Sequence, residues 1–401
     1  MPNTAEVFAA TRRQFILPEA VVYLDGNSLG PLTAAARQRL VEELDEHWAP
    51  KLIRGWNESG WMDLPNTVGD KIAALVGAPP GSVVAADSTS VNLFKVLSAA
   101  LAMRPGRKVV LSDSGNFPTD LYVAQGLVRS LGAGHELRTV APDDIASAID
   151  DSVAVVMLTE VDYRTGRLHS MAELTELAHE AGALIIWDLC HSAGALPVQL
   201  EDSRADFAVG CGYKYLNGGP GAPAYMYVRP DLIASCSPAL CGWMGHAEPF
   251  AFGLGHVPAE GIGRLRCGTP PILAMACLDA ALNVWEGVDL QDVREVSSKL
   301  SSLFIEEVER RCPEFVLASP RDPDRRGSHV SFRFPHGYAV MQALIGRGVI
   351  GDFRAPDMMR FGFTPLYIDQ RDVLRAVEVL GEVVRDRLWD CAEFKARRTV
   401  T

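Results

Sequence analysis

The sequence lacks the features that mark several large classes of protein. Its eight cysteines are scattered, with no CxxC pair and no Cys/His spacing typical of zinc, so we expect reduced thiols and no metal site. No apolar run approaches membrane-spanning length, and the N-terminus has no apolar core typical of a signal peptide. A formal net charge of -12 argues against general affinity for nucleic acid or anionic membrane. These absences favour a cytoplasmic protein with neither kind of partner.

What the sequence does contain is the composition of an ordinary globular enzyme. Its 401 residues are 48% hydrophobic and 22% charged, enough for one large and one small domain. From Ser82 onward short apolar runs alternate with helical patterns, which predicts an α/β domain with a mostly parallel sheet covered on both faces. Past Gly263 longer helices and short strands predict a smaller α+β domain. We expect an N-terminal segment over 1–30, the large domain over 31–270 and the small one over 271–401.

Individual elements can be predicted within these domains. A helical pattern covers 33–48, and the aromatic segment RGWNESGWMD after it is expected to be a loop. In the C-terminal part, helices are expected over 271–285 and 290–311. The strands expected in the large domain are 83–86, 108–111, 153–158, 183–187, 207–209 and 224–228, the last antiparallel to its neighbours. Short strands are expected near 315, over 330–334 and over 349–353.

The stretch GCGYKYLNGGPG contains the first candidate for chemistry, Lys214. It lies between two apolar runs, and the glycines on both sides let a bulky ligand approach the backbone. A solvated loop lysine is the commoner reason for such a residue. The alternative is an amine that forms a Schiff base with a carbonyl compound. Lys214 alone does not decide between the two.

The stretch LIIWDLCHSAG contains the second candidate, Asp188, with His191 close behind it. A carboxylate at the carboxyl end of a buried strand lies where open α/β sheets hold their ligands, although an aspartate capping the next helix is equally compatible. Asp188 and Lys214 follow successive strands. Such a pair suits pyridoxal phosphate, because the carboxylate can keep the pyridine nitrogen protonated while the lysine binds the aldehyde carbon.

Two strand-to-helix junctions and a tyrosine fit the same cofactor. Thr89 and Ser90, preceded by another serine, stand where backbone amides and hydroxyls can hold a phosphate, although helix capping would account for one of them. Phe117 begins a second junction and could stack on a flat ring or act as a hydrophobic staple. Tyr213, next to Lys214, could reach the phosphate with its hydroxyl.

The motifs taken together resemble those of the kynureninases, which are fold-type I pyridoxal phosphate enzymes. The resemblance covers most of the chain, in order: YLDGNSLGP, NFPTD, TEVDYRTGRLH, WDLCHSAG, GCGYKYLNGGPG, CGTPPI and MRFGFTPLY. It implies hydrolysis of the Cβ–Cγ bond of L-kynurenine to anthranilate and L-alanine, a step of tryptophan catabolism in the kynurenine pathway that can also supply NAD biosynthesis. It also implies pyridoxal 5'-phosphate as the cofactor.

The resemblance assigns roles to individual positions. Lys214 would bind the cofactor and move protons, Asp188 would hold the pyridine nitrogen, and Tyr213 would act as an acid or base. Trp243 and Thr269 would line the cofactor from a second subunit, which implies a homodimer with shared active sites. The remaining cofactor-binding residues that the resemblance implies are Thr89, Ser90, Phe117, Pro118, Thr119, Asp120, Thr159 and His191.

Three further positions would bear on the substrate. Arg360 matches the arginine that grips the substrate α-carboxylate, a task suited to a bidentate guanidinium; a surface salt bridge is the alternative. Trp56 and Thr269 stand where animal kynureninases have histidine and asparagine. This departure favours L-kynurenine over 3-hydroxykynurenine.

Two rival functions remain at this stage. One is another fold-type I enzyme, such as a cysteine desulfurase or a class V aminotransferase, although a desulfurase needs a mobile persulfide cysteine and usually has histidine before its lysine, where this chain has Tyr213. The other is a catalytically silent binding protein on the same fold. Retention of Lys214, Asp188 and Arg360 together argues against the second rival.

Overall fold

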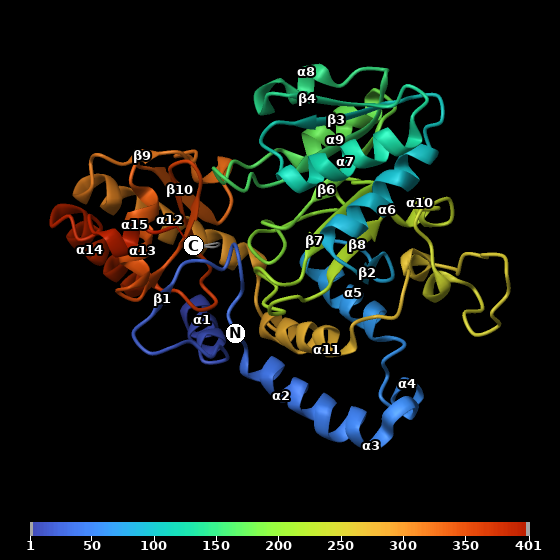
Figure 1. Ribbon diagram of the computed structural model, residues 1–401, viewed down its shortest axis with the longest axis horizontal. Coiled ribbons are helices and arrows are strands. Elements are labelled where there is room, and N and C mark those ends of the chain that lie inside the picture. The colour runs from blue at the N-terminus through green and yellow to red at the C-terminus, as the bar shows by residue number, and fades with distance from the viewer. Residues whose placement is uncertain (1–2, 398–401) are drawn as a thin grey trace.

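The computed structural model describes residues 3–397, and its centre is a seven-stranded sheet in the order β2-β8-β7-β6-β5-β3-β4 (Figure 1). The strands β4, β3, β5, β6 and β7 run parallel, whereas β8 is antiparallel to both β7 and β2. The expected antiparallel strand is therefore confirmed. The bounds are β2 (Val83–Ala85), β3 (Val109–Asp113), β4 (Glu136–Val140), β5 (Val153–Thr159), β6 (Leu184–Asp188), β7 (Phe207–Cys211) and β8 (Ala224–Val228).

Both faces of this sheet are buried, as its continuous apolar strands predict. In β5, Val156 and Leu158 belong to one hydrophobic cluster and Val155 and Met157 to the other, so alternate side chains enter opposite cores. The covering helices include α5 (Leu64–Leu75), α6 (Thr89–Ala102), α7 (Pro118–Leu131) and α9 (Met171–Glu180). The α/β fold class is confirmed.

Strand β4 was not predicted from the sequence. It forms the edge of the sheet, pairs with β3 alone among the described strands, and has no fully buried side chain. Its sequence ELRTV is mostly polar because an edge strand needs no continuous apolar face. The apolar runs that identified the central strands are consequently missing here.

The C-terminal part contains a four-stranded antiparallel sheet in the order β12-β13-β10-β9. Helix α12 (Leu290–Arg311) has the predicted bounds, and the expected strand over 349–353 is divided in two at Gly351. A Cβ at Gly351 would lie 2.7 Å from the Arg360 carbonyl oxygen, so the break requires glycine. The elements are β9 (Val316–Leu317), η7 (Pro323–Arg325), β10 (His329–Arg333), α13 (Gly337–Ile345), β11 (Val349–Ile350), β12 (Asp352–Arg354), β13 (Met358–Gly362), α14 (Gln370–Arg385) and α15 (Ala392–Lys395).

The N-terminal segment lies against this C-terminal part (Figure 1). Helix α1 (Thr4–Arg12) donates a hydrogen bond from Thr11 to the carbonyl of Leu366, 2.9 Å long, and β1 (Val22–Tyr23) pairs in parallel with β11. The chain segment between β1 and α2 (Ala34–Glu42) then returns to the large sheet.

The aromatic segment that was expected to be a loop is partly helical. After α2 come η1 (Glu43–Trp48), α3 (Ala49–Lys51), η2 (Leu52–Arg54) and α4 (Gly55–Glu58). The Trp61 indole packs on Gly55 and donates to the Glu43 carboxylate over 2.9 Å, which holds these short turns together. The sequence pattern could not show this, because the contact joins residues eighteen positions apart.

The remaining elements are helical, and most of them are short. Helix α11 (Ile272–Ala281) packs against α2 and α5. No helix within residues 3–397 is both long and apolar enough to cross a membrane. The other elements are η3 (Pro142–Asp144), α8 (Ile145–Ala148), α10 (Pro230–Ile233), η4 (Trp243–Gly245), η5 (Ile262–Leu265) and η6 (Leu282–Trp285).

Candidate active site

The candidate site lies at the carboxyl ends of three adjacent parallel strands. Thr159 ends β5, Asp188 ends β6, and Lys214 follows β7 by three residues. The register pairs Thr159 directly with Asp188. Side chains that are well separated in the sequence therefore meet at one edge of the sheet, as the strand-end argument predicts.

The loop that carries Lys214 is held by the N-terminal segment. The amide of Gly30 donates to the carbonyl of Tyr213 over 2.8 Å, and a Cβ on Gly30 would lie 2.3 Å from the Lys214 carbonyl oxygen. Asn217 closes the loop with a φ of 58°, a left-handed conformation that asparagine tolerates. Gly30, the second glycine of YLDGNSLGP, therefore lets this motif contact the distant motif that carries Lys214.

The Lys214 amine has a histidine as its neighbour. Its Nζ lies 3.2 Å from His191 Nε2, and the His191 side chain is buried. Burial, followed by the charge of Lys214, holds the pKa of His191 well below its ordinary value. His191 is therefore neutral, and its Nε2 can accept a hydrogen bond from the lysine.

Two buried carboxyl groups face each other beside the lysine. Asp120, in the first turn of α7, contacts Asp188, and burial together with the negative charge of Asp188 raises the pKa of Asp120 well above its usual range. Asp188 accepts the amide hydrogen of Cys190 over 2.7 Å. Within residues 3–397 the Oδ2 atom of Asp120 has no hydrogen-bond partner. A cationic group placed against this pair would satisfy both carboxyls.

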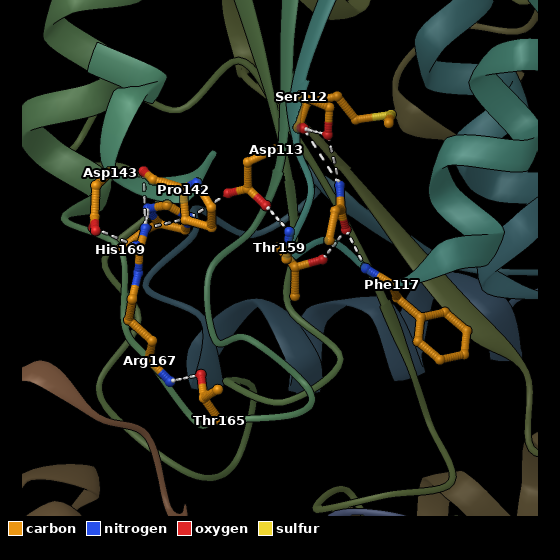
Figure 2. A network of polar contacts seen from close by, with 12 residues as sticks. Ser112, Asp113, Phe117, Pro142, Asp143, Thr159, Thr165, Arg167 and His169 are labelled. Atoms are coloured by element: carbon orange, nitrogen blue, oxygen red, sulfur yellow. Dashed lines mark hydrogen bonds and ion pairs between the residues drawn. The ribbon is translucent and has the colours of Figure 1, made fainter. Parts of the chain in front are cut away.

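A polar network positions Phe117 at the start of α7 (Figure 2). Thr159 donates to the Asn116 side-chain oxygen, which also accepts the backbone amide of Phe117 over 2.8 Å. The Asn116 amide group donates to Ser112 over 3.0 Å. The Phe117 ring points away from these contacts and is 42% exposed, so one face is available to a flat ligand.

The first turn of α6 offers a site for an anion. Thr89 and Ser90 follow the cap residue Ser88 and begin helix α6, which has fourteen residues. The free backbone amides and the positive end of the helix dipole therefore lie at this end of the helix. The Thr89 hydroxyl lies 3.7 Å from the thiol of Cys190, just beyond β6. Burial is the main reason that the pKa of the nearby Tyr213 hydroxyl is raised, so this group is protonated at neutral pH.

A cavity of about 130 Å³ opens above Lys214. Arg360 reaches it from β13, is only 1% exposed, and pairs with Asp352 of the neighbouring strand β12. The Arg360 Nε to Asp352 Oδ1 distance is 2.7 Å. The buried position excludes the surface salt bridge considered from the sequence. The lining residues are Asn27, Ser28, Phe117, Tyr163, His191, Tyr213, Lys214, Arg354 and Arg360.

Four of these lining residues were not singled out from the sequence. Asn27 and Ser28 belong to YLDGNSLGP and Tyr163 to TEVDYRTGRLH, so the quoted motifs contained the signal. Arg354 lies outside every quoted motif, and only the pairing of β12 with β13 brings it to the cavity.

Of the predicted residues that do not line this cavity, three have their contacts elsewhere in the chain or are exposed to solvent. Trp56 packs edge-on against Trp61 with ring centroids 5.5 Å apart. Trp243 is 40% exposed and packs on Phe250, and Thr269 is exposed. Within a single chain, these residues are not part of the cavity around Lys214.

Comparisons with known proteins agree with this arrangement. Residues 293–380 match the kynureninase C-terminal domain, and residues 53–200 match the DegT/DnrJ/EryC1/StrS aminotransferase family. The chain is 51% identical to a kynureninase of Pseudomonas fluorescens, with 100% of this chain and 98% of that protein covered. It is 47% identical to a kynureninase of Burkholderia pseudomallei, with 98% and 96% covered.

Solved structures share the fold at lower sequence identity. The cysteine desulfurase of Thermococcus onnurineus has a TM-score of 0.79 at 20% identity, covering 94% of this chain and 98% of its own. A mutant of C-DES with glycine covalently linked to its PLP cofactor has a TM-score of 0.78 at 18% identity, covering 95% and 100%. These likenesses establish the fold-type I architecture, and the full-length identity of 51% decides the family. The chain belongs to the kynureninase family.

Proposed function

We propose that this chain hydrolyses the Cβ–Cγ bond of L-kynurenine to anthranilate and L-alanine with pyridoxal 5'-phosphate as cofactor. The observation that carries the proposal is the meeting of Lys214, the Asp120–Asp188 pair and Arg360 around one site. The surrounding sequence is 51% identical to a kynureninase over its full length. These residues supply an amine, a partner for a cationic ring nitrogen and a partner for a carboxylate.

The residues present fit the cofactor. Two buried carboxyls in contact, one of them with an oxygen that has no hydrogen-bond partner among residues 3–397, are costly unless a proton or a cation lies between them. A protonated pyridine nitrogen provides that cation. Lys214 would hold the aldehyde carbon, and Asp188 and Asp120 would hold the ring nitrogen. Phe117 would cover one face of the ring, and the phosphate would be bound by Thr89, Ser90 and Tyr213. The surrounding wall would be formed by Pro118, Thr119, Thr159 and His191.

Lys214 is the proposed proton carrier. When bound, pyridoxal phosphate supplies an electron sink for a carbanion at the substrate Cα. The Lys214 amine removes the Cα proton, and the neutral His191, 3.2 Å away, orients that amine without competing for its proton. The His191 imidazole acts here by position rather than by charge.

Tyr213 and Arg360 are proposed to act on the two ends of the substrate. The Tyr213 hydroxyl, kept protonated by burial, donates a hydrogen bond to the γ-carbonyl oxygen as water adds there. Arg360 lies at the cavity wall and binds the α-carboxylate. Loss of the aryl carboxylic acid product, anthranilate, then leaves the three-carbon fragment to be protonated and released as L-alanine.

The proposal includes a homodimer. The segment around Phe250, Phe252, Leu254 and Val257 exposes large apolar side chains, Leu254 completely. This yellow segment extends from the body of the molecule (Figure 1). Several exposed apolar side chains within one segment favour contact with another protein surface, here a second copy. Trp243, next to this segment, would then reach the neighbouring site.

The proposed preference is for L-kynurenine over 3-hydroxykynurenine. Trp56 and Thr269 lie outside the cavity of their own chain. The proposal places them beside the substrate ring of the other copy in the dimer. A tryptophan and a threonine offer the 3-hydroxyl fewer hydrogen-bonding groups than histidine and asparagine do. The double substitution Trp56→His with Thr269→Asn should shift the preference toward 3-hydroxykynurenine.

The function is tested with three substrates measured side by side on the purified holoenzyme. Fluorescence of the aryl product follows kynurenine and 3-hydroxykynurenine, and sulfide release from L-cysteine tests the desulfurase alternative. We expect turnover of kynurenine and slower turnover of its 3-hydroxy analogue. Sulfide release without anthranilate formation would replace the proposal with the desulfurase, and no turnover of any substrate would favour a silent binding protein.

A further inference from the structure

The cavity above Lys214 has a second arginine, Arg354, in addition to Arg360. Arg354 ends β12, two residues after Asp352, so both side chains lie on the same face of that strand. Asp352 is paired directly with Arg360 across the β12–β13 ladder. Two guanidinium groups and one carboxylate therefore lie together at the cavity wall.

Arg360 has few hydrogens left for a ligand. Its Nε and Nη2 both donate to Asp352, Nη2 also donates to the Ser28 hydroxyl over 3.1 Å, and Nη1 donates to the carbonyl of Tyr163. A guanidinium has five N–H groups, so these contacts leave one. Asp352 already occupies the edge of Arg360 that forms a bidentate pair. Arg360 alone cannot offer a fork to a carboxylate while Asp352 keeps it.

Arg354 has hydrogens to spare. Its Nη2 lies 2.8 Å from Asp352 Oδ2 and 3.5 Å from the Ser28 hydroxyl, and Nη1 donates to the carbonyl of Phe353 over 3.1 Å. Within residues 3–397, its Nε makes no hydrogen bond. The side chain is 37% exposed, against 2% for Arg360, so it can still move. Arg354 is consequently the accessible guanidinium of the pair.

The charges of the cluster are not balanced. Although burial raises it, the hydrogen bond and charge of Arg360 hold the pKa of Asp352 below its usual value, so Asp352 is an anion. The neighbouring Asp25 has its pKa raised to about 7, by burial and then by the charge of Asp352. Below about pH 7 Asp25 is mostly protonated, so the two arginines then face little more negative charge than that of Asp352. A net positive charge inside a largely buried cavity favours an anionic ligand.

We propose that Arg354 is a second substrate-binding residue, and that the α-carboxylate lies between Arg354 and the one remaining N–H of Arg360. Asp352 keeps its pairing with Arg360 throughout and so holds that arginine in a fixed orientation. This inference rests on the proposed function, because it names the part of the amino-acid substrate that Arg354 binds. The inference also explains how the buried Asp352 can occupy the bidentate edge of Arg360 while the cavity still binds a carboxylate.

The test uses two ligands of the holoenzyme that need no turnover. L-Alanine has the α-amine and the α-carboxylate, whereas 2-aminoacetophenone has the aryl ketone and neither of these groups. Their dissociation constants are measured by titration of the holoenzyme absorbance for the wild type, Arg354→Gln and Arg354→Lys. The matched control is Arg333→Gln. Arg333 is an exposed arginine on β10 that forms a 2.9 Å ion pair with Asp357 and does not line the cavity.

Arg354→Gln should weaken L-alanine binding about tenfold or more, because it removes a charge-assisted hydrogen bond. Binding of 2-aminoacetophenone should stay the same, Arg354→Lys should recover part of the loss, and Arg333→Gln should match the wild type. Equal weakening of both ligands would show that Arg354 only supports the fold of the site and would overturn the inference. Unchanged L-alanine binding would overturn it as well. A wild type that binds L-alanine yet does not cleave kynurenine would instead refute the proposed function.

Discussion

Replacing Glu160 by glutamine should make the unfolding free energy of the protein less sensitive to a rise in pH from 5 to 8. Glu160 follows β5 directly, and its backbone amide donates to the carbonyl of Asp188 over 3.0 Å. The side chain is fully buried, and its Oε2 atom has no hydrogen-bond partner among the described residues. Burial raises the pKa of Glu160 from 4.5 to about 7, although the nearby Ser192 hydroxyl and then the charge of Arg294 lower it in part.

The sign of the effect follows from proton linkage. The folded chain favours the neutral acid, so the stabilisation from Glu160 is fully present below about pH 4.5 and is lost as pH rises through about 7. Between pH 5 and pH 8 the wild type should lose roughly 2–3 kcal/mol of unfolding free energy from this group alone. Glutamine has nearly the same shape and does not titrate, so Glu160→Gln should not lose it.

The assay is urea unfolding of wild type and variant at pH 5 and pH 8, with the same excess of cofactor throughout. The unfolding free energy of the variant relative to the wild type should rise by roughly 2–3 kcal/mol between the two pH values. Glu176→Gln, an exposed site on α9, controls for the loss of a surface charge and should show little change. A difference that is the same at both pH values would refute the reasoning, because it would mean that Arg294 keeps Glu160 ionised in the folded chain.

Three further predictions concern the site and the dimer. Lys214→Ala should abolish both the yellow absorbance of the holoenzyme and kynurenine turnover. It should cost little stability, because the amine has only His191 as a hydrogen-bond partner among the described residues, and a variant that stays yellow and active would contradict the assignment. Arg360→Ala should weaken kynurenine binding by about 3 kcal/mol or more and lower the melting temperature, because it removes the partner proposed for the α-carboxylate and leaves the buried Asp352 with only Arg354 and Ser28 among the described residues; an unchanged Michaelis constant would count against it. Leu254→Asp should shift the protein from dimer to monomer in light scattering, whereas a stable dimer would exclude that surface from the interface.

Much of the large domain was readable from the sequence because its strands are buried on both faces. Continuous apolar runs such as 153–158 and 183–187, bounded by polar and turn residues, are typical of central strands in a parallel sheet, and the strand ends follow directly from them. Lys214 and Asp188 stood out for the same reason, as charged residues at the ends of apolar segments. The edge strand β4 was missed because an edge does not require that pattern.

The sequence by itself determined which residue types stand at the strand ends and which family the motifs resemble, since both are properties of short contiguous stretches. Only the tertiary structure decided which charges face one another. Arg360 was predicted to present its fork to the substrate, yet the β12–β13 register places Asp352 against it, and the same register brings Arg354 to the cavity. Asp120 meets Asp188 because α7 begins beside the end of β6. Pairings of this kind depend on strand register and helix placement, which arise from packing over the whole core and leave no local pattern in the chain.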